Sequence, residues 1–408
     1  MGIKGLAKLL SDEAPECIEE QPLNSLQGRR VAIDASMAIY QFLIAVRTGS
    51  ANHAAAMLTN SEGEVTSHVQ GMFNRTVRYL SEGIRPVFVF DGKPPVFKSG
   101  ELLKRRAKRA KAEVDLKAAQ EAENIEEQDK HNKRLVRAGT KENDDCKRLL
   151  RLMGVPVVEA PCEAEAQAAA LCAAGKVYAV GTEDMDALTF ATPVLLRKMA
   201  FANDTKFKLQ VMHYKKAVDG LGLTHAEFVD LCILMGCDYC DPIRGVGPKT
   251  ALKLIREHKN IETILQNISD KKYTVPAEWL PPKKNAAEEG TDDETPKEDE
   301  EPFVPVYVHA RRLFNEHEVT PPDSFNFKWG DTLDADALTK FLVEDMSFSA
   351  DRVATQVLKL KKAFASTKKP QARMDSFFKV VSKPKPKVGA GDKRKAPAKK
   401  KAPNKKRK

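Results

Sequence analysis

Short apolar runs alternate with helical patterns through the first half of the chain. Four runs rich in β-branched and aromatic residues are bounded by Gly, Pro or charged residues, at 29–36, 85–92, 154–161 and 176–184. Helical periodicity lies between them, most clearly over 67–81 and 163–174. Strands that alternate with helices predict an α/β fold with a mostly parallel sheet and helices on both of its faces.

Residues 98–137 interrupt this alternation. They are rich in Lys, Arg, Glu, Gln and Ala and carry few large apolar residues, so they should be helical without packing as a core helix. Either a projecting helical arm or a solvated helical insertion would satisfy this pattern. The basic residues of the segment could meet phosphates or could form a solvated charged face: Lys98, Lys104, Arg105, Arg106, Lys108, Arg109 and Lys111.

Carboxylates follow the ends of the predicted strands. Asp34 ends the first strand, Asp91 ends the second, and acids directly follow the fourth apolar run in VYAVGTEDMDALTF. The candidate set has seven members: Asp34, Asp91, Glu163, Glu165, Asp184, Asp186 and Asp238. Each alone has a structural explanation, since Asp34, for example, could cap the following helix. Because parallel strands present their carboxyl ends at one edge, we expect the set to lie together.

Carboxylates without His or Cys partners suit a hard cation such as Mg²⁺ or Mn²⁺. Clustered acids repel one another unless cations neutralise them, which would explain why the chain tolerates them. Residues two apart on a helix diverge by about 200°, so Glu163 and Glu165 need not contact the same ion. A site of many acids that holds two ions is typical of phosphodiester cleavage.

Charge is distributed unevenly over the 408 residues, whose formal net charge is +10. Residues 383–408 hold thirteen Lys or Arg and one acid, whereas 283–301 hold nine acids and three Lys. The remainder is only mildly basic, so a nucleic-acid surface there has to come from local patches. The acidic stretch 283–303 is predicted to be a disordered loop, and the chain after about 367 a flexible tail.

Several classes of protein are disfavoured. No apolar run is long enough to span a bilayer, and the first residues lack the apolar core of a signal peptide. Seven scattered cysteines fit a reducing compartment. Cys232, Cys237 and Cys240 have a spacing found around some iron–sulfur clusters, but no fourth cysteine follows and Cys232 lies in an apolar helical run. A core role is therefore favoured over a cluster.

The stretch IRGVGPKTALKLI, residues 243–255, has the form of a helix–hairpin–helix element. Gly245 and Gly247 would let backbone N–H groups approach a phosphate at a helix N-terminus, without reading sequence. Lys249 and Lys253 lie on the helix that follows. A lone Gly-x-Gly is common in turns, and the following helix strengthens the interpretation.

Six stretches together resemble the flap endonuclease family: MGIKGLAKLL, VAIDASMAIYQFLIAVR, VFVFDGKPP, EAEAQAAAL, TEDMDALTF and GCDYCDPIRGVGPK. The resemblance runs from residue 1 to about 380. It implies a monomeric, Mg²⁺-dependent nuclease that removes 5′ flaps and has 5′–3′ exonuclease activity. The family's roles would be Okazaki fragment maturation in DNA replication and long-patch base excision repair.

The resemblance also implies residue roles. One Mg²⁺, replaceable by Mn²⁺, would be held by Asp34, Asp91, Glu163 and Glu165, and a second by Asp184, Asp186 and Asp238. Lys98 and Arg105 match residues that steer the scissile phosphate, and Tyr40 matches an aromatic that stacks near the cleavage point. Contacts to DNA would come from Arg47, Arg75, Glu163, Gly236, Asp238, Gly245, Gly247 and Lys249. Carbonyl groups of the hairpin would hold a K⁺ ion.

The implied organisation has overlapping regions. They are an N-terminal nuclease region at 1–109, a helical arch at 98–137, an internal nuclease region with the hairpin at 127–258, a C-terminal part of the fold at 259–366 and the tail at 367–408. The chain departs from the family pattern at the acidic insert 283–301 and at the extra segment 48–64, which lies near the grip on the 3′ side of the junction. Cys237 replaces a more usual serine, and Pro242 stands where a residue lends a carbonyl to K⁺.

The tail contains QARMDSFF, residues 371–378, whose apolar residues have no core to join. One turn of 3₁₀ helix would place Met374 and Phe377 on one face, with Phe378 beside them. The alternative is a remnant of the last helix of the fold. With Gln371, the pattern resembles the peptide by which replication enzymes dock on the sliding-clamp trimer, PCNA. The final lysine runs predict nuclear import and weak retention on DNA. The expected location is the nucleus, in nucleolus and nucleoplasm, with the mitochondrion as a second compartment.

Three rival functions fit the sequence less well. A clamp-binding repair scaffold without catalysis would have lost some of the seven acids, and none is missing. A relative that cuts repair bubbles would carry hundreds of residues between the second and third strands, whereas Glu163 follows Asp91 by only 72 positions. A toxin-type ribonuclease with a similar acidic sheet edge would lack both the hairpin and the tail.

Overall fold

The computed structural model describes residues 2–45, 59–60, 62–122, 124–136, 138–200, 208–269, 272–281 and 303–367. These residues belong to one compact unit, Met1–Lys369. Several predicted features fall outside the described residues: Arg47, most of the extra segment 48–64, the acidic insert 283–301, the clamp peptide 371–378 and the basic end of the chain.

A mixed sheet forms the centre of the unit. Within the described residues it has seven strands in the order β1-β7-β6-β5-β2-β3-β4. Their bounds are β1 Ile18–Gln21, β2 Arg30–Asp34, β3 Arg85–Phe90, β4 Val157–Glu159, β5 Ala179–Gly181, β6 Val194–Arg197 and β7 Leu209–His213. Strands β6, β5, β2, β3 and β4 are parallel neighbours, and β7 is antiparallel to both β6 and β1. The prediction of a mostly parallel sheet is confirmed.

Side chains of β3 show why helices cover both faces. Phe88 and Phe90 point into a core with α2 (Ala35–Ala45), α3 (Ser67–Ser81) and α6 (Thr140–Leu152), whereas Val87 and Val89 pack with α7 (Ala164–Ala173). All four are at most 1% exposed. Since successive residues of a strand face opposite sides, a strand that is apolar throughout needs helices on both faces.

Each of the four predicted runs contains a strand, although the strands are shorter than the runs. Within the run 154–161 only the three residues of β4 form a strand. The predicted helix 67–81 matches α3. Short 3₁₀ turns complete the connections at Pro15–Cys17, Leu23–Leu26, Val96–Lys98, Ala277–Trp279 and Pro322–Ser324.

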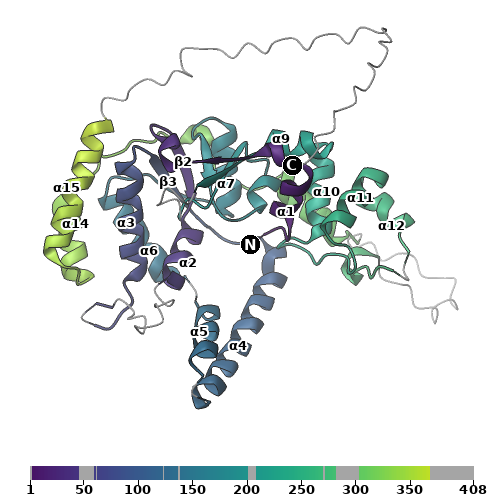
Figure 1. The fold of residues 1–408 in the computed structure, drawn as a ribbon, viewed down its shortest axis with the longest axis horizontal. Helices are drawn as coiled ribbons and strands as arrows, with labels where there is room; N and C mark the ends of the chain where they lie inside the picture. The colour runs from purple at the N-terminus through teal and green to yellow at the C-terminus, as the bar shows by residue number, and fades with distance from the viewer. Residues whose placement is uncertain are drawn as a thin grey trace, which may run out of the picture. The chain divides into compact units, whose positions relative to one another are not determined.

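The charged segment 98–137 forms a helical pair, α4 (Ser99–Glu121) and α5 (Ile125–Arg134), that projects away from the sheet (Figure 1). Along α4 only Ala112 and Ala119 are buried. The projecting arm is therefore the alternative that the structure supports. Because its apolar stripe is too narrow for a core, the two helices pack mainly against each other.

A second core lies beyond the antiparallel edge of the sheet. It joins α1 (Leu6–Glu13), α9 (Tyr214–Leu221), α10 (His225–Met235), α11 (Pro248–His258), α12 (Ile261–Asn267) and α13 (Val306–Asn315). Helices α10 and α11 with the loop between them are the predicted helix–hairpin–helix. Gly245 in that loop has φ 89°, and a Cβ there would lie 3.1 Å from the Lys272 carbonyl oxygen, so the turn favours glycine.

The C-terminal helices cover the outer side of α3. They are α14 (Ala335–Lys340), a π-helical turn at Phe341–Asp345 and α15 (Ala350–Thr367), of which α15 packs directly on α3 (Figure 1). None of the helices in the described ranges is both long and apolar enough to cross a membrane.

Candidate active site

Neighbouring parallel strands bring the predicted acids to one edge of the sheet. Asp34 is the last residue of β2, and Asp91 follows β3 directly. Asp184 follows β5, and Asp186 begins the short helix α8, Asp186–Thr189. Because β5, β2 and β3 are adjacent and parallel, their carboxyl ends meet at the same edge. Glu163 caps the N-terminus of α7 beside it.

Hydrogen bonds fix several of these acids. Asp34 Oδ1 accepts the Met37 N–H at 2.9 Å, so it does cap α2, and its Oδ2 accepts the Thr182 hydroxyl at 2.9 Å. Asp91 Oδ1 accepts the backbone N–H of Ala164 at 2.9 Å. Each of these acids therefore keeps its structural bond while belonging to the cluster.

Burial makes the cluster electrostatically unfavourable. Asp34 and Asp186 are only 4% and 7% exposed. Burial, with the nearby charge of Asp91, raises the pKa of Asp34 to about 7. Burial also raises the pKa of Glu165 well above its ordinary value, assisted by Asp34, and that of Asp186, assisted by Asp184. The acids resist ionising together, as expected of a cluster that lacks enough positive charge.

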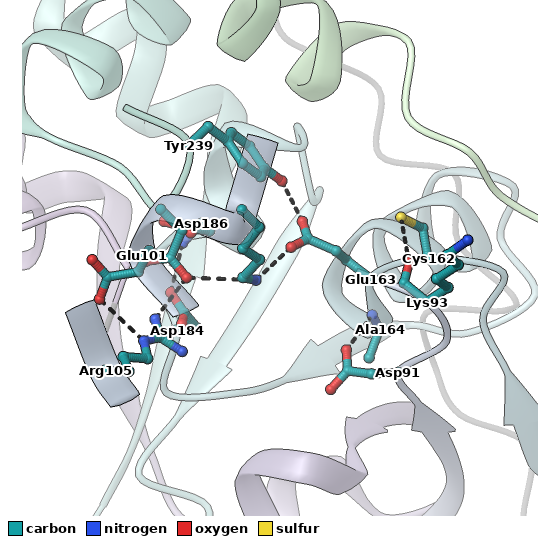
Figure 2. A network of polar contacts seen from close by, with 12 residues as sticks. Asp91, Lys93, Glu101, Arg105, Cys162, Glu163, Ala164, Asp184, Asp186 and Tyr239 are labelled. Atoms are coloured by element: carbon teal, nitrogen blue, oxygen red, sulfur yellow. Dashed lines mark hydrogen bonds and ion pairs between the residues drawn. The ribbon is translucent and has the colours of Figure 1, made fainter. Parts of the chain in front are cut away.

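Two cationic side chains from the base of the arm reach into the acids. Lys98 Nζ forms an ion pair with Glu163 and lies 3.5 Å from Asp238 Oδ2. Arg105 on α4 donates from Nη2 to Asp238 Oδ2 at 2.8 Å, and its Nε donates to Glu101 at 3.1 Å (Figure 2). Burial alone would lower the pKa of Lys98, but Glu163 and Asp238 raise it above its ordinary value.

The hairpin loop adds Tyr239, which sequence reasoning did not select. Its buried hydroxyl donates to Glu163 Oε2 (Figure 2). The other oxygen of the same carboxylate, Oε1, pairs with Lys98. Burial, followed by the charge of Glu163, raises the pKa of Tyr239. No pattern distinguishes this tyrosine in the sequence, although it directly follows the candidate Asp238.

The start of the chain also meets the site. Gly2 has φ 70°, and a Cβ there would overlap Asp184 Oδ1 and Asp186 Oδ1. The backbone at Gly2 therefore passes against these two carboxylates in a space that only glycine allows. Sequence analysis did not predict this contact, because a contact across more than 180 positions leaves no local signal.

Other predicted residues lie apart from the acids or at their margin. Tyr40 is half-buried and packs with the core of α2 and α3. Arg75 donates to Gln41 Oε1 at 2.8 Å, stacks 4.0 Å from the centre of the Phe42 ring, and lines a small cavity with Asp34. Their roles toward DNA stay predictions.

The hairpin presents a basic surface. Gly247 caps the N-terminus of α11, and Gly236 has φ 95° at the end of α10. Lys249 is exposed beside a shallow groove of about 410 Å³, lined by Glu13, Lys249, Leu252, Lys253, Arg256 and Glu257. Lys249 and Lys253 lie in the N-terminal half of α11, where cationic side chains and free backbone N–H groups are suited to phosphate contacts.

The donor set fits divalent cations that prefer oxygen. The acids offer carboxylate oxygens alone, and the buried Asp186 Oδ1 accepts no hydrogen bond in the part of the chain that is described. Among those residues, no three acidic, His or Cys side chains are already gathered closely enough to hold an ion. Binding would therefore require the carboxylates to turn toward the cation, which would relieve their repulsion.

Comparison with known proteins agrees with this arrangement. The chain matches the XPG N-terminal domain over residues 1–112 and the XPG I-region over 154–238. It is 62% identical to Flap endonuclease 1 of Phaeodactylum tricornutum over 396 residues, which cover 94% of this chain and 93% of that protein. Identity to Flap endonuclease 1 of Phytophthora infestans is 49% over 402 residues, or 98% and 96% of the two chains.

A solved structure extends the likeness to the fold. The flap endonuclease-1 of Methanococcus jannaschii is 30% identical, with a TM-score of 0.62 over 88% of this chain and 98% of that one. The fold, the acidic edge and the two XPG regions define a nuclease that hydrolyses phosphodiester bonds. The chain belongs to the flap endonuclease family, whose members are structure-specific nucleases that cut 5′ flaps. The bubble-cutting, scaffold and toxin-type alternatives are therefore disfavoured.

Proposed function

We propose that the enzyme cuts branched DNA at the base of a 5′ flap, using two Mg²⁺ ions held by the acids at the sheet edge, and that it also acts as a 5′–3′ exonuclease. The observation that supports this most strongly is the cluster of buried carboxylates with raised pKa values at the carboxyl ends of β2 and β5. Mn²⁺ would substitute for Mg²⁺, because the same oxygen ligands suit both.

The predicted ligands divide into two groups. One ion would be held by Asp34, Asp91, Glu163 and Glu165, and the other by Asp184, Asp186 and Asp238. When bound, the pair of ions would supply an activated water and stabilise charge on the phosphate. Thr182 keeps Asp34 oriented through its hydroxyl, and Tyr239 orients Glu163.

The arm contributes positive charge where negative charge would grow. Lys98 and Arg105 already lie against Glu163 and Asp238, so a phosphate that enters among the acids comes within their reach. Both are fixed by ion pairs before the substrate arrives, which makes them suited to stabilising a transition state. The remaining basic residues of α4 would guide the flap strand, and the hairpin around Lys249 would grip the duplex, with K⁺ bound by its carbonyl groups.

A direct test compares a 5′-flap substrate with a blunt duplex of the same sequence, each in Mg²⁺ and in EDTA. We expect rapid cleavage at the flap base in Mg²⁺, slow removal of nucleotides from the blunt 5′ end, and neither reaction in EDTA. Equal rates on both substrates, or cleavage that survives EDTA, would overturn the proposal.

In the cell, the proposed role is in replication and long-patch base excision repair as a monomer docked on the sliding clamp, in the nucleus with the mitochondrion as a second compartment. The sequence of 371–378 supports the docking, because Phe377 and Phe378 stand among lysines and prolines. Docking would raise the concentration of enzyme at the junction without changing the chemistry. Changing both phenylalanines to alanine should abolish clamp binding and leave flap cleavage without clamp unchanged.

The basic end of the chain gives a matched control for docking. Deleting 383–408 should leave clamp binding in place and should weaken nuclear accumulation and salt-sensitive DNA retention. Calorimetry that finds normal clamp affinity in the double-phenylalanine variant would contradict the docking proposal.

A further inference from the structure

Two thiols lie in contact within the hairpin loop. Cys237 Sγ and Cys240 Sγ are 3.7 Å apart, in the bend that follows α10. Both are free thiols, Cys237 partly exposed and Cys240 only 7% exposed. Neither thiol has been given a role by the proposed chemistry, which uses carboxylates and cationic side chains.

The two residues between these cysteines both contact the active site. Asp238 accepts from Arg105 at 2.8 Å and lies 3.5 Å from Lys98 Nζ. Tyr239 donates its hydroxyl to Glu163. A covalent link between Cys237 and Cys240 would therefore close a small ring around the two residues that connect the hairpin to the acids.

A metal ion is a weaker explanation for the pair. Two sulfurs supply only half of a tetrahedral site, and the described residues contain no third acidic, His or Cys side chain placed to join them. Cysteines in a C-x-x-C arrangement are instead suited to disulfide formation, and in a reducing compartment such disulfides are usually transient and redox-sensing.

We propose that Cys237 and Cys240 are a modification site, which peroxide oxidises to a disulfide that reversibly lowers nuclease activity. Hydrogen peroxide converts the thiol of the partly exposed Cys237 to a sulfenic acid and releases one water. The Cys240 thiol then attacks that sulfur, the S–S bond forms, and a second water leaves. Two thiols and one peroxide thus give one disulfide and two waters, and a dithiol reductant reverses the change.

The geometry explains why activity should fall. The sulfurs must approach from 3.7 Å to about 2.05 Å, and the two residues they enclose must adjust to this movement. Gly236, with φ 95°, lies directly before the pair. As a glycine it can change its backbone angles at little cost when the sulfurs approach each other. A displacement of about 1 Å in a positioned catalytic group can cost roughly 10²-fold in rate. We expect a loss of this order once the disulfide forms.

The test uses the full chain and two independent readouts. Reduced enzyme is treated with hydrogen peroxide, free thiols are alkylated, and the digested protein is analysed by mass spectrometry. We expect the peptide that contains Cys237 and Cys240 to lose two hydrogens and resist alkylation. Single-turnover cleavage of a 5′ flap should fall roughly 10²-fold and return after dithiothreitol.

Variants separate this site from other oxidation. Cys237→Ser should retain basal activity and resist peroxide, and Cys240→Ser should resist likewise. Cys162→Ser is the matched control, because Cys162 is also partly exposed and directly precedes Glu163. It should lose activity in peroxide as the wild type does.

The inference rests on the proposed function, and the readouts keep the two apart. Reduced wild type that does not cut flaps would contradict the proposed function, whereas the mass measurement does not depend on cleavage. Absence of the disulfide, a disulfide that leaves the rate unchanged, or equal inactivation of Cys237→Ser would each overturn the redox proposal.

Discussion

The molecule buries acids at two places, and the two differ in how the buried negative charge is balanced. Behind the hairpin, Asp230 is 3% exposed and receives two bonds from Arg311, Nε to Oδ1 at 2.8 Å and Nη2 to Oδ2 at 2.9 Å. The Ile261 N–H adds a third, and Arg311 also bonds Glu262. This network joins α10, α12 and α13, and its one buried acid, Asp230, is matched by one guanidinium, while the Glu262 side chain is 43% exposed.

The sheet edge shows the opposite balance. Seven acids gather there, while the cationic side chains that reach them are Lys98 and Arg105. One buried oxygen, Asp186 Oδ1, is left without a partner among the described residues. The comparison teaches that burial of a carboxylate is not by itself a sign of function. In the matched cluster, loss of the cationic partner is what costs stability, whereas the unmatched cluster costs stability as it stands and signals a ligand that supplies the missing charge.

The largest expected effect is on cleavage. Asp184→Ala should lower single-turnover flap cleavage in Mg²⁺ by roughly 10³-fold or more, because it removes a predicted metal ligand. Affinity for flap DNA should change little, since no phosphate contact is lost. Glu183→Gln is the matched control, because Glu183 is the neighbouring acid and bonds the Lys198 N–H instead. Near-normal turnover in Asp184→Ala would show that Asp184 is not a metal ligand needed for cleavage.

The next largest loss of rate is expected from the two cationic side chains of the unmatched cluster, Lys98 and Arg105. Lys98→Ala and Arg105→Ala should each lower the single-turnover rate by roughly 10²- to 10³-fold, with a smaller loss of affinity, because they act on charge that grows in the transition state. Lys108→Ala, on an exposed position of the same arm, should change affinity alone. If Lys98→Ala and Arg105→Ala lose affinity but keep their rates, these residues only hold phosphate.

The matched cluster should respond through stability. Arg311→Ala should lower the free energy of unfolding by about 3 kcal/mol, because it leaves Asp230 buried without its guanidinium. Arg312→Ala, at the exposed neighbouring position, should cost much less. By contrast, Asp186→Asn should be no less stable than wild type in EDTA, because it relieves repulsion. Urea unfolding measures all three, and a large loss in Asp186→Asn would contradict the comparison.

A smaller effect concerns pH. Burial holds the pKa of Asp34 at about 7 in the folded protein, compared with about 4 in an unfolded chain. The folded state therefore keeps a proton that the unfolded state has lost, and this contribution to stability declines as the pH rises from about 4 to 7. In EDTA, Asp34→Asn should become more stable relative to wild type across that interval. A constant difference, measured by urea unfolding at several pH values, would contradict the shift.

Sequence alone located six of the acids because each follows a recognisable strand or lies at the start of a helix, whereas Asp238 lies in the loop after α10. Asp34 and Asp91 end apolar runs, and those runs are the interior strands β2 and β3. Strands β1, β6 and β7 were not predicted. The antiparallel pairing of β1 with β7 joins residues nearly two hundred positions apart, which no local pattern reveals.

Contacts between residues distant in sequence were the other features that could not be predicted from the sequence. Tyr239 with Glu163, Thr182 with Asp34, and the Asp230–Arg311 network all join residues that are distant in sequence. Asp230 lies in an apolar helical stretch, and nothing in that stretch reveals its partner Arg311, 81 positions away. Only the positions of the cations distinguish the matched cluster from the unmatched one.

The central claim is that the unmatched acids hold divalent cations, and direct ion binding tests it best. Electron paramagnetic resonance counts the free Mn²⁺ that remains as protein is titrated without DNA. We expect wild type and Arg312→Ala to bind Mn²⁺ at the site alike, and the double variant Asp184→Ala with Asp186→Asn to lose the ion assigned to these two acids. Circular dichroism should confirm that the double variant is folded. A folded double variant that binds as many Mn²⁺ ions as wild type, with equal affinity, would contradict the account.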